Sequence, residues 1–142
     1  MKKLISLSVV MLFVLSFFSV NSLAADKKTK TAVSKTAMVE VYYFHYTRRC
    51  ITCNAVENVT KEAIAEMYPT QSKKGQIKFK SINLDEKENE AIAKKCQSEG
   101  QSLLFIAKGQ RIDLTDKGFM YAKSSPEKLK AEVKKTIDSL LK

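Results

Sequence analysis

Two of the three cysteines, Cys50 and Cys53, are separated by only two residues. A pair with this spacing can form a disulfide, exchange it with thiols of another molecule, or bind a metal ion. A helix is predicted to begin here, which would place the Cys50 sulfur near unpaired backbone N–H groups that stabilise a thiolate. We therefore expect Cys50 to be a nucleophile, and Cys53, one helical turn later, to resolve the mixed disulfide.

Three further residues near the pair are candidates for an accessory role. Arg48 and Arg49 directly precede Cys50, where their positive charge would favour the thiolate, although either could be a solvated loop residue. His45, the only histidine, lies at the end of a predicted buried strand. It is expected to be a hydrogen-bonded structural residue or to take part in proton transfer.

Two other interpretations of the cysteine pair stay open. The pair could form a structural disulfide, but so short a loop constrains little of the unfolded chain, and its stabilising effect should be small. The pair could instead bind a soft ion such as copper(I) or zinc, with Cys96 or His45 as further ligands. A closed four-ligand zinc site would need all three cysteines and the histidine, and nothing in their spacing requires it.

The third cysteine, Cys96, shares a predicted helical face with Ile92. It has no partner if the other two cysteines bond to each other. One interpretation is a small buried apolar residue, because free cysteine is commonly buried. The other places Cys96 at the rim of the site, where it could form a mixed disulfide or a dimer bond.

Hydrophobic periodicity predicts the elements that position these residues. Residues 39–46 are rich in β-branched and aromatic residues, typical of a central strand buried on both faces. A helix follows and ends at Tyr68-Pro69, because the residue before a proline avoids the helical region. The remaining predicted elements are a loop at 70–75, strands at 76–84, 103–107 and 111–115, a helix at 85–97, and a final helix starting at Ser125-Pro126. This β-α-β-α-β-β-α order predicts an α/β fold, with a mixed four-stranded sheet and helices on both faces.

The amino-terminal segment is typical of an exported protein. Two lysines, an apolar run over residues 4–20 and small residues at 22–25 predict a signal peptide at 1–24. A polar, basic tether at 25–37 would then lead to one domain at 38–142. We expect no stable membrane insertion after cleavage, or an amino-terminal anchor if the signal stays. The net charge of +10 is spread along the chain without a basic stripe carrying aromatics, which argues against nucleic-acid binding.

Residues 38–142 resemble the thioredoxin fold. Three segments carry the resemblance: the strand-loop-helix stretch 43–53, the strand 77–85, and the segment 100–109 that enters a hairpin. The first stretch is also similar to a small group of exported bacterial proteins described as a nitrophenyl-compound nitroreductase subunit, although nothing here resembles a flavin site. The resemblance implies a thiol-disulfide oxidoreductase of the Gram-negative periplasm, with no cofactor beyond the redox-active disulfide Cys50-Cys53. Its partners would be protein thiols or disulfides, or a membrane electron donor.

The sequence departs from the thioredoxin pattern in the expected substrate groove and beneath it. Ile51 and Thr52 replace the usual glycine and proline between the cysteines. Ser102 stands where the family normally has a cis-proline, so the preceding bond is expected to be trans. Phe44 stands where thioredoxin buries a proton-accepting aspartate. These changes keep open a redox-inactive subunit that serves to bind a partner.

Overall fold

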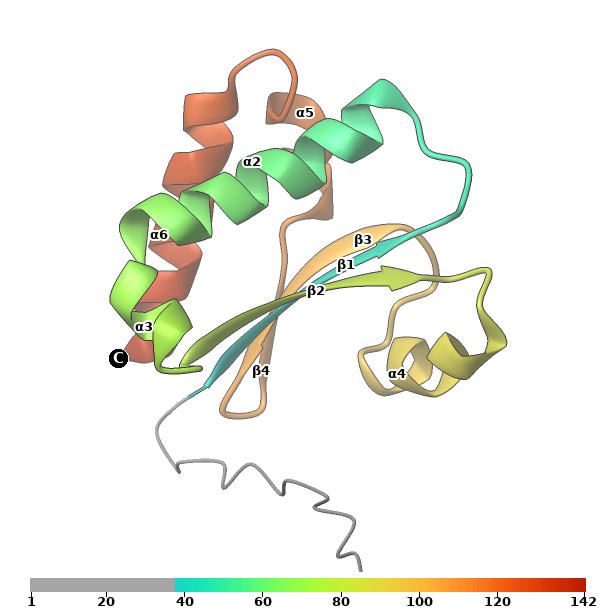
Figure 1. Ribbon diagram of the computed structural model, residues 1–142, viewed down its shortest axis with the longest axis horizontal. Coiled ribbons are helices and arrows are strands. Elements are labelled where there is room, and N and C mark those ends of the chain that lie inside the picture. The colour runs from blue at the N-terminus through green and yellow to red at the C-terminus, as the bar shows by residue number, and fades with distance from the viewer. Residues whose placement is uncertain (1–37) are drawn as a thin grey trace, which may run out of the picture. The chain divides into compact units, whose positions relative to one another are not determined.

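The computed structural model describes residues 38–142, and the predicted signal peptide (1–24) and tether (25–37) lie outside this range. The described chain is an α/β fold with one mixed four-stranded sheet, as predicted (Figure 1). Its strands are β1 (Val39–His45), β2 (Ile77–Asn83), β3 (Ser102–Ala107) and β4 (Gln110–Asp113). Its α-helices are α2 (Ile51–Met67), α3 (Pro69–Lys73), α4 (Glu90–Lys95), α5 (Thr115–Tyr121) and α6 (Pro126–Leu141). No helix within residues 38–142 is long and apolar enough to cross a membrane.

Strand β1 lies inside the sheet, whose order is β2-β1-β3-β4. It runs parallel to β2 and antiparallel to β3, and β4 pairs antiparallel with β3. Side chains alternate along β1, so that Val41 and Tyr43 face one side of the sheet while Tyr42 and Phe44 face the other. All four are buried, which confirms the prediction of a strand covered on both faces.

The two faces carry cores of different size. Helices α2, α5 and α6 cover one face and enclose the larger hydrophobic cluster with side chains of β1 and β3 (Figure 1). The short helix α4 covers the other face, over a smaller cluster that includes Phe44, Leu104 and Cys96. Helices therefore lie on both faces, and the larger core supports the helix that begins at the cysteine pair.

The structure adds a helix where the sequence predicted the loop 70–75. Helix α2 ends at Met67 as expected, because Tyr68 precedes a proline and takes a non-helical φ of −132°. Proline is well suited to the first position of a helix, and the chain turns helical again at Pro69 to form α3. The loop prediction was wrong because it assumed that Pro69 also keeps the residues after it from forming a helix. Pro69 disfavours helical geometry only at the residue before it, Tyr68.

The predicted helix 85–97 is shorter than expected. Only a 3₁₀ turn at Lys87–Asn89 and helix α4 form there. The side chains of Asn83 and Asn89 hold the preceding segment in turns: Asn83 Oδ1 accepts from the Asp85 amide at 3.1 Å, and Asn89 Nδ2 donates to the Asn83 carbonyl at 2.9 Å. Such local side-chain bonds compete with the helical backbone pattern.

Helix α5 was not predicted, and its position depends on tertiary packing. The Asp113 carboxylate accepts hydrogen bonds from the amide and hydroxyl of Thr115 at the start of the helix. Gly118 then lets α5 approach α2 and β3, since a Cβ on Gly118 would lie 3.2 Å from Val56 Cγ1 and 3.6 Å from Leu103 Cδ2. This contact closes the larger core beside the first turns of α2.

Candidate functional site

Cys50 and Cys53 form a disulfide at the start of helix α2, with Cα atoms 5.0 Å apart. Cys50 is the N-cap residue, with extended backbone angles, and its sulfur accepts a hydrogen bond from the Cys53 amide at 3.0 Å. The sulfur thus occupies the place that a serine or aspartate oxygen commonly takes at a helix start. The first turn of α2 contains no acidic residue that would oppose a negative charge there.

The two cysteines differ in exposure. Cys50 is exposed, whereas Cys53 is 5% exposed and belongs to the core side of the helix. Between them, Ile51 is 73% exposed and Thr52 is half-buried. A thiol from another molecule therefore has access to the disulfide from the Cys50 side.

Tyr43 connects the backbone of Cys53 to the segment before strand β3. Its hydroxyl donates to the Cys53 carbonyl at 2.9 Å and accepts from Gln101 Nε2 at 3.1 Å. Burial raises the pKa of Tyr43, against hydrogen bonds from Gln101 and Arg49 that lower it. The phenol therefore stays protonated and serves as a fixed hydrogen-bonding group under the disulfide.

Ser102 follows Gln101 and begins β3. Its peptide bond is trans, as expected, since residues 38–142 contain no cis bond. The side chain is 7% exposed, and its hydroxyl lies 2.8 Å from the Ser98 hydroxyl, which in turn donates to the Gly100 carbonyl. These bonds hold the 97–102 loop in one shape beside the site.

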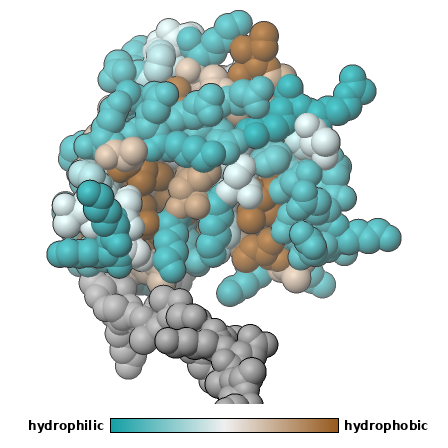
Figure 2. Space-filling view, viewed as in Figure 1, coloured by the Kyte–Doolittle hydropathy of each residue, from teal (hydrophilic) through white to brown (hydrophobic). Residues whose placement is uncertain are grey.

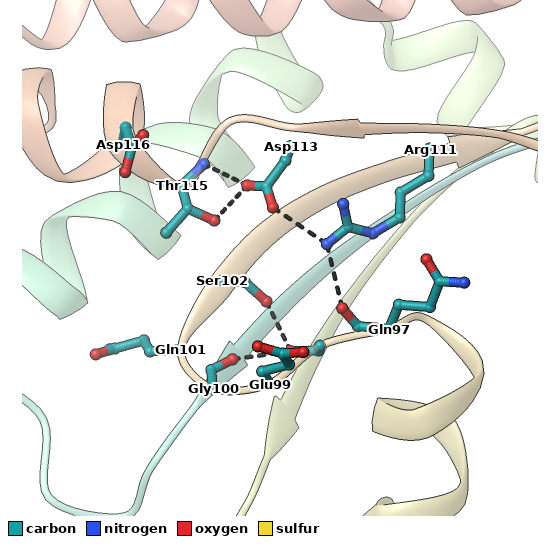
Figure 3. Close-up of a pocket in the computed structure, with 10 residues that line it drawn as sticks. Gln97, Glu99, Gly100, Gln101, Ser102, Arg111, Asp113, Thr115 and Asp116 are labelled. Atoms are coloured by element: carbon teal, nitrogen blue, oxygen red, sulfur yellow. Dashed lines mark hydrogen bonds and ion pairs between the residues drawn. The ribbon is translucent and has the colours of Figure 1, made fainter.

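A polar hollow of about 440 Å³ adjoins this loop (Figure 3). The 97–102 segment forms one wall, and residues of β4 and the start of α5 form the other. Arg111 spans it, donating to the Gln97 carbonyl at 3.3 Å and to Asp113 at 3.1 Å. Ser102 and Gln101 line the hollow but neither cysteine does, so it is a neighbour of the disulfide and not its binding cleft.

The residues 46–49 that precede Cys50 are tied to neighbouring segments. The Thr47 amide donates to Asp85 Oδ2 at 2.7 Å, and this bond is the main cause of the lowered pKa of Asp85.

Tyr46 is 44% exposed and reaches Gly100: a Cβ on Gly100 would lie 3.7 Å from the Tyr46 hydroxyl. Tyr46 and Ile51 are two of the three large hydrophobic side chains exposed in the described part of the chain, the third being Met120 on α5. Elsewhere, hydrophilic side chains dominate the face seen in Figure 2.

The two arginines before Cys50 have different surroundings. Arg48 is exposed, as expected of a solvated loop residue. Arg49 folds inward: its guanidinium pairs with Glu57 of helix α2, and its Cζ lies 5.4 Å from the centre of the Tyr43 ring. The positive charge of Arg49 is therefore partly balanced by a carboxylate that the sequence analysis did not identify.

Glu57 is 6% exposed and lies one helical turn after Cys53. Its second carboxylate oxygen accepts from Lys61 at 2.5 Å. Burial alone would raise the pKa of Glu57, but hydrogen bonds and charges from Lys61 and Arg49 outweigh it and lower the pKa. The carboxylate is therefore ionised at neutral pH, with both oxygens engaged.

His45 lies at the end of β1, on the same side of the sheet as Tyr43. Its Nδ1 donates to the Tyr46 carbonyl at 3.0 Å, since a carbonyl can only accept, and its ring stacks on Tyr43 with centroids 5.8 Å apart. This geometry agrees with the interpretation of a hydrogen-bonded structural residue. The bond also leaves Nε2 as the nitrogen that can accept a proton.

Cys96 lies apart from the disulfide. It is 4% exposed and packs with Tyr42, Phe44 and Leu104 in the smaller core, on the other face of the sheet. Burial raises the pKa of its thiol, and the nearby Glu40 carboxylate adds to the increase. Its position agrees with a small buried apolar residue and not with one at the rim of the site.

The structure separates the ligands that a closed four-ligand metal site would need. Cys96 is on the opposite face from the disulfide, and residues 38–142 contain no group of three or more cysteine, histidine or acidic side chains placed to hold a metal ion. The ligand set of Cys50, Cys53, Cys96 and His45 is thus not assembled. Phe44 of β1 also faces the smaller core, on the opposite side of the sheet from the disulfide. The buried carboxylate on the disulfide side is therefore Glu57 of α2 and not a residue of β1.

Three residues of the site were missed by the sequence analysis: Tyr43, Glu57 and Gln101. A signal for Glu57 was present, because it follows Cys53 by four residues and precedes Lys61 by four, which places all three on one helical face. Gln101 carried no such signal, since it lies 58 residues from Tyr43 in the sequence.

Comparison with protein-family models, curated proteins and solved structures finds no match to the chain.

Proposed function

We propose that the protein is an exported thiol-disulfide oxidoreductase with a thioredoxin-like fold, in which Cys50 is the nucleophile and Cys53 the resolving thiol. The observation that carries the proposal is the asymmetry of the pair. Cys50 is exposed and its sulfur accepts a backbone N–H at a helix start, whereas Cys53 is buried one turn behind it. A structural disulfide would need neither feature.

Each step of the exchange is assigned to one cysteine. In the reduced protein, the Cys50 thiolate attacks one sulfur of a partner disulfide, whose S–S bond breaks and releases a partner thiolate. Cys53 then loses its proton to water and attacks the Cys50 sulfur, which forms the Cys50–Cys53 disulfide and releases the second partner thiolate. Two electrons pass to the partner, and each released thiolate takes up a proton from solvent. The reverse sequence oxidises a partner dithiol.

Three further features support the proposal. The β-α-β unit that holds the pair, followed by an antiparallel hairpin and a carboxy-terminal helix, is consistent with a thioredoxin-like fold. The exposed Ile51 and Tyr46 side chains beside Cys50 would contact an apolar part of a partner protein. The predicted signal peptide would take the protein to the periplasm, where disulfides persist.

The test is the reduction potential of the pair, measured by glutathione equilibration and thiol trapping on the full chain carrying Cys96→Ala. We expect one reversible two-electron couple between about −120 and −270 mV, the span from a strong exported oxidant to thioredoxin. With a disulfide-bonded protein substrate, Cys53→Ala should accumulate a mixed disulfide and Cys50→Ala should not. A pair that does not cycle, or equal trapping by both variants, would contradict the proposal.

A further inference from the structure

Glu57 is the only charged residue that is buried in the described part of the chain, and the exchange steps above do not use it. It lies within α2, four residues after Cys53 and seven after Cys50. Burying a carboxylate costs free energy unless it is paired and hydrogen-bonded, and replacing such a pair by apolar residues is often neutral or stabilising. A buried ion pair is therefore weak evidence for a purely stabilising role.

The ion pair of Glu57 encloses the disulfide segment. One of its two partners, Arg49, is the residue directly before Cys50, so this pair joins the two ends of the stretch that contains both cysteines. Arg49 also lies over Tyr43, whose hydroxyl donates to the Cys53 carbonyl. The guanidinium is thus held at two points, by a carboxylate and by an aromatic ring.

Glu57 is poorly suited to accept a proton from Cys53. Its pKa is lowered, and both oxygens already accept hydrogen bonds, one from Arg49 and one from Lys61. Its chemical effect is instead that of a fixed negative charge beside Arg49. Arg49 Nε, in addition, is buried and has no hydrogen-bond acceptor among residues 38–142. Arg49 therefore keeps both a partly balanced charge and an unused donor close to the cysteine segment.

We propose that Glu57 is a positioning residue that holds Arg49 behind the disulfide and limits how strongly the Arg49 charge stabilises the Cys50 thiolate. The balance between this anion and cation then sets the position of the Cys50–Cys53 redox equilibrium. This second statement rests on the proposed oxidoreductase function, whereas the first concerns only the ionisation of a thiol.

The test compares Glu57→Gln, Arg49→Met and the double variant, each with Cys96→Ala, against Glu62→Gln as a matched control. Glu62 is on the same helix but 59% exposed, with Lys130 3.8 Å away. The first readout is the pH dependence of iodoacetamide alkylation of Cys50 in the reduced protein. The second is the equilibrium constant with glutathione.

Opposite changes are expected from the two single variants. Glu57→Gln leaves Arg49 on Tyr43 without its counter-ion, so the alkylation midpoint should move to lower pH and the equilibrium should shift toward the dithiol by roughly three- to tenfold. Arg49→Met should move both readouts the other way, and the double variant should return close to the parent. Tenfold corresponds to about 30 mV for this two-electron couple.

Two results would overturn the inference. Glu57→Gln could match Glu62→Gln in both readouts, which would make the ion pair purely structural, or it could match Arg49→Met, which would mean that Arg49 leaves the site. If Glu57→Gln does not fold, Lys61→Met on a half-exposed side chain replaces it and should shift alkylation in the direction of Arg49→Met. The alkylation readout needs no partner disulfide, so a parent pair that does not cycle contradicts the proposed function without deciding this inference.

Discussion

The two faces of the sheet each hold a cysteine, in opposite settings. Cys50 lies at the amino end of a 17-residue helix, exposed, with a backbone amide donating to its sulfur. Cys96 follows the last residue of the 6-residue helix α4, and burial raises the pKa of its thiol. The comparison shows that the position of a cysteine on its helix and its access to solvent separate a candidate nucleophile from a core residue.

Each face also holds an ion pair that includes a glutamate. Glu57, on the side of the larger core, is buried and pairs with the partly buried Arg49 and the half-exposed Lys61. Glu40, on the face of the smaller core, bonds Lys80 at 2.8 Å, and both of those side chains are about one third exposed or more. The Glu57 carboxylate is therefore shielded from water, while the Glu40–Lys80 pair on the other face is partly exposed.

The largest expected effect that separates the two faces is thiol reactivity. In the reduced protein at pH 7, iodoacetamide should modify Cys50 about 100-fold or more faster than Cys96, because only Cys50 is exposed and has a backbone amide donating to its sulfur. Peptide mass spectrometry of timed reactions measures the two rates separately. In urea the rates should become equal. A native Cys96 that reacts as fast as Cys50 would remove the distinction.

Leu103 and Leu104 are adjacent on β3, fully buried, and face opposite cores. Replacing either one by alanine should lower the free energy of unfolding by about 2–5 kcal/mol, since each leaves a cavity. Chemical denaturation measures both losses. Only Leu104→Ala should also speed alkylation of Cys96, because it loosens the smaller core. Equal acceleration by Leu103→Ala would show that the two cores do not open independently.

The buried ion pair should make stability depend on pH. The pKa of Glu57 in the folded protein lies below its ordinary value of 4.5, so its stabilisation is complete above that value and is lost as the pH falls through the folded pKa. Glu57→Gln should cost about 1–3 kcal/mol at pH 7, and the difference from the parent should shrink in acid. Urea titrations at pH 7 and pH 3 measure it. A constant difference would argue against an ionised Glu57.

The smallest effect is expected for the solvated pair. Glu40→Gln should cost less than about 1 kcal/mol at pH 7, because an exposed ion pair gains little over hydration. Its contribution should fall further in 0.5 M salt, whereas that of Glu57 should change little. The same denaturation series with added salt tests both. A larger cost for Glu40 than for Glu57 would reverse the comparison.

Much of the architecture follows from local pattern. The apolar run of β1, the helical spacing up to Tyr68-Pro69 and the Ser125-Pro126 start predicted β1, α2 and α6 to within about two residues. The two-residue spacing of the cysteines likewise placed Cys50 and Cys53 one turn apart at a helix start. These features depend on residues close in sequence, so the periods of strand and helix are enough to predict them.

The rest depends on contacts between distant residues. Helix α5 forms where Gly118 fits against Val56 and Leu103, Tyr43 meets Gln101, and Cys96 enters the core on the far face. The pairing of Arg49 with Glu57 is closer in sequence, but it requires the loop before Cys50 to fold back along α2. The sequence alone identifies the residues that could do chemistry and the elements on which they lie. Which charges and thiols share one environment depends on the tertiary structure, because burial and pairing are properties of packing and not of spacing.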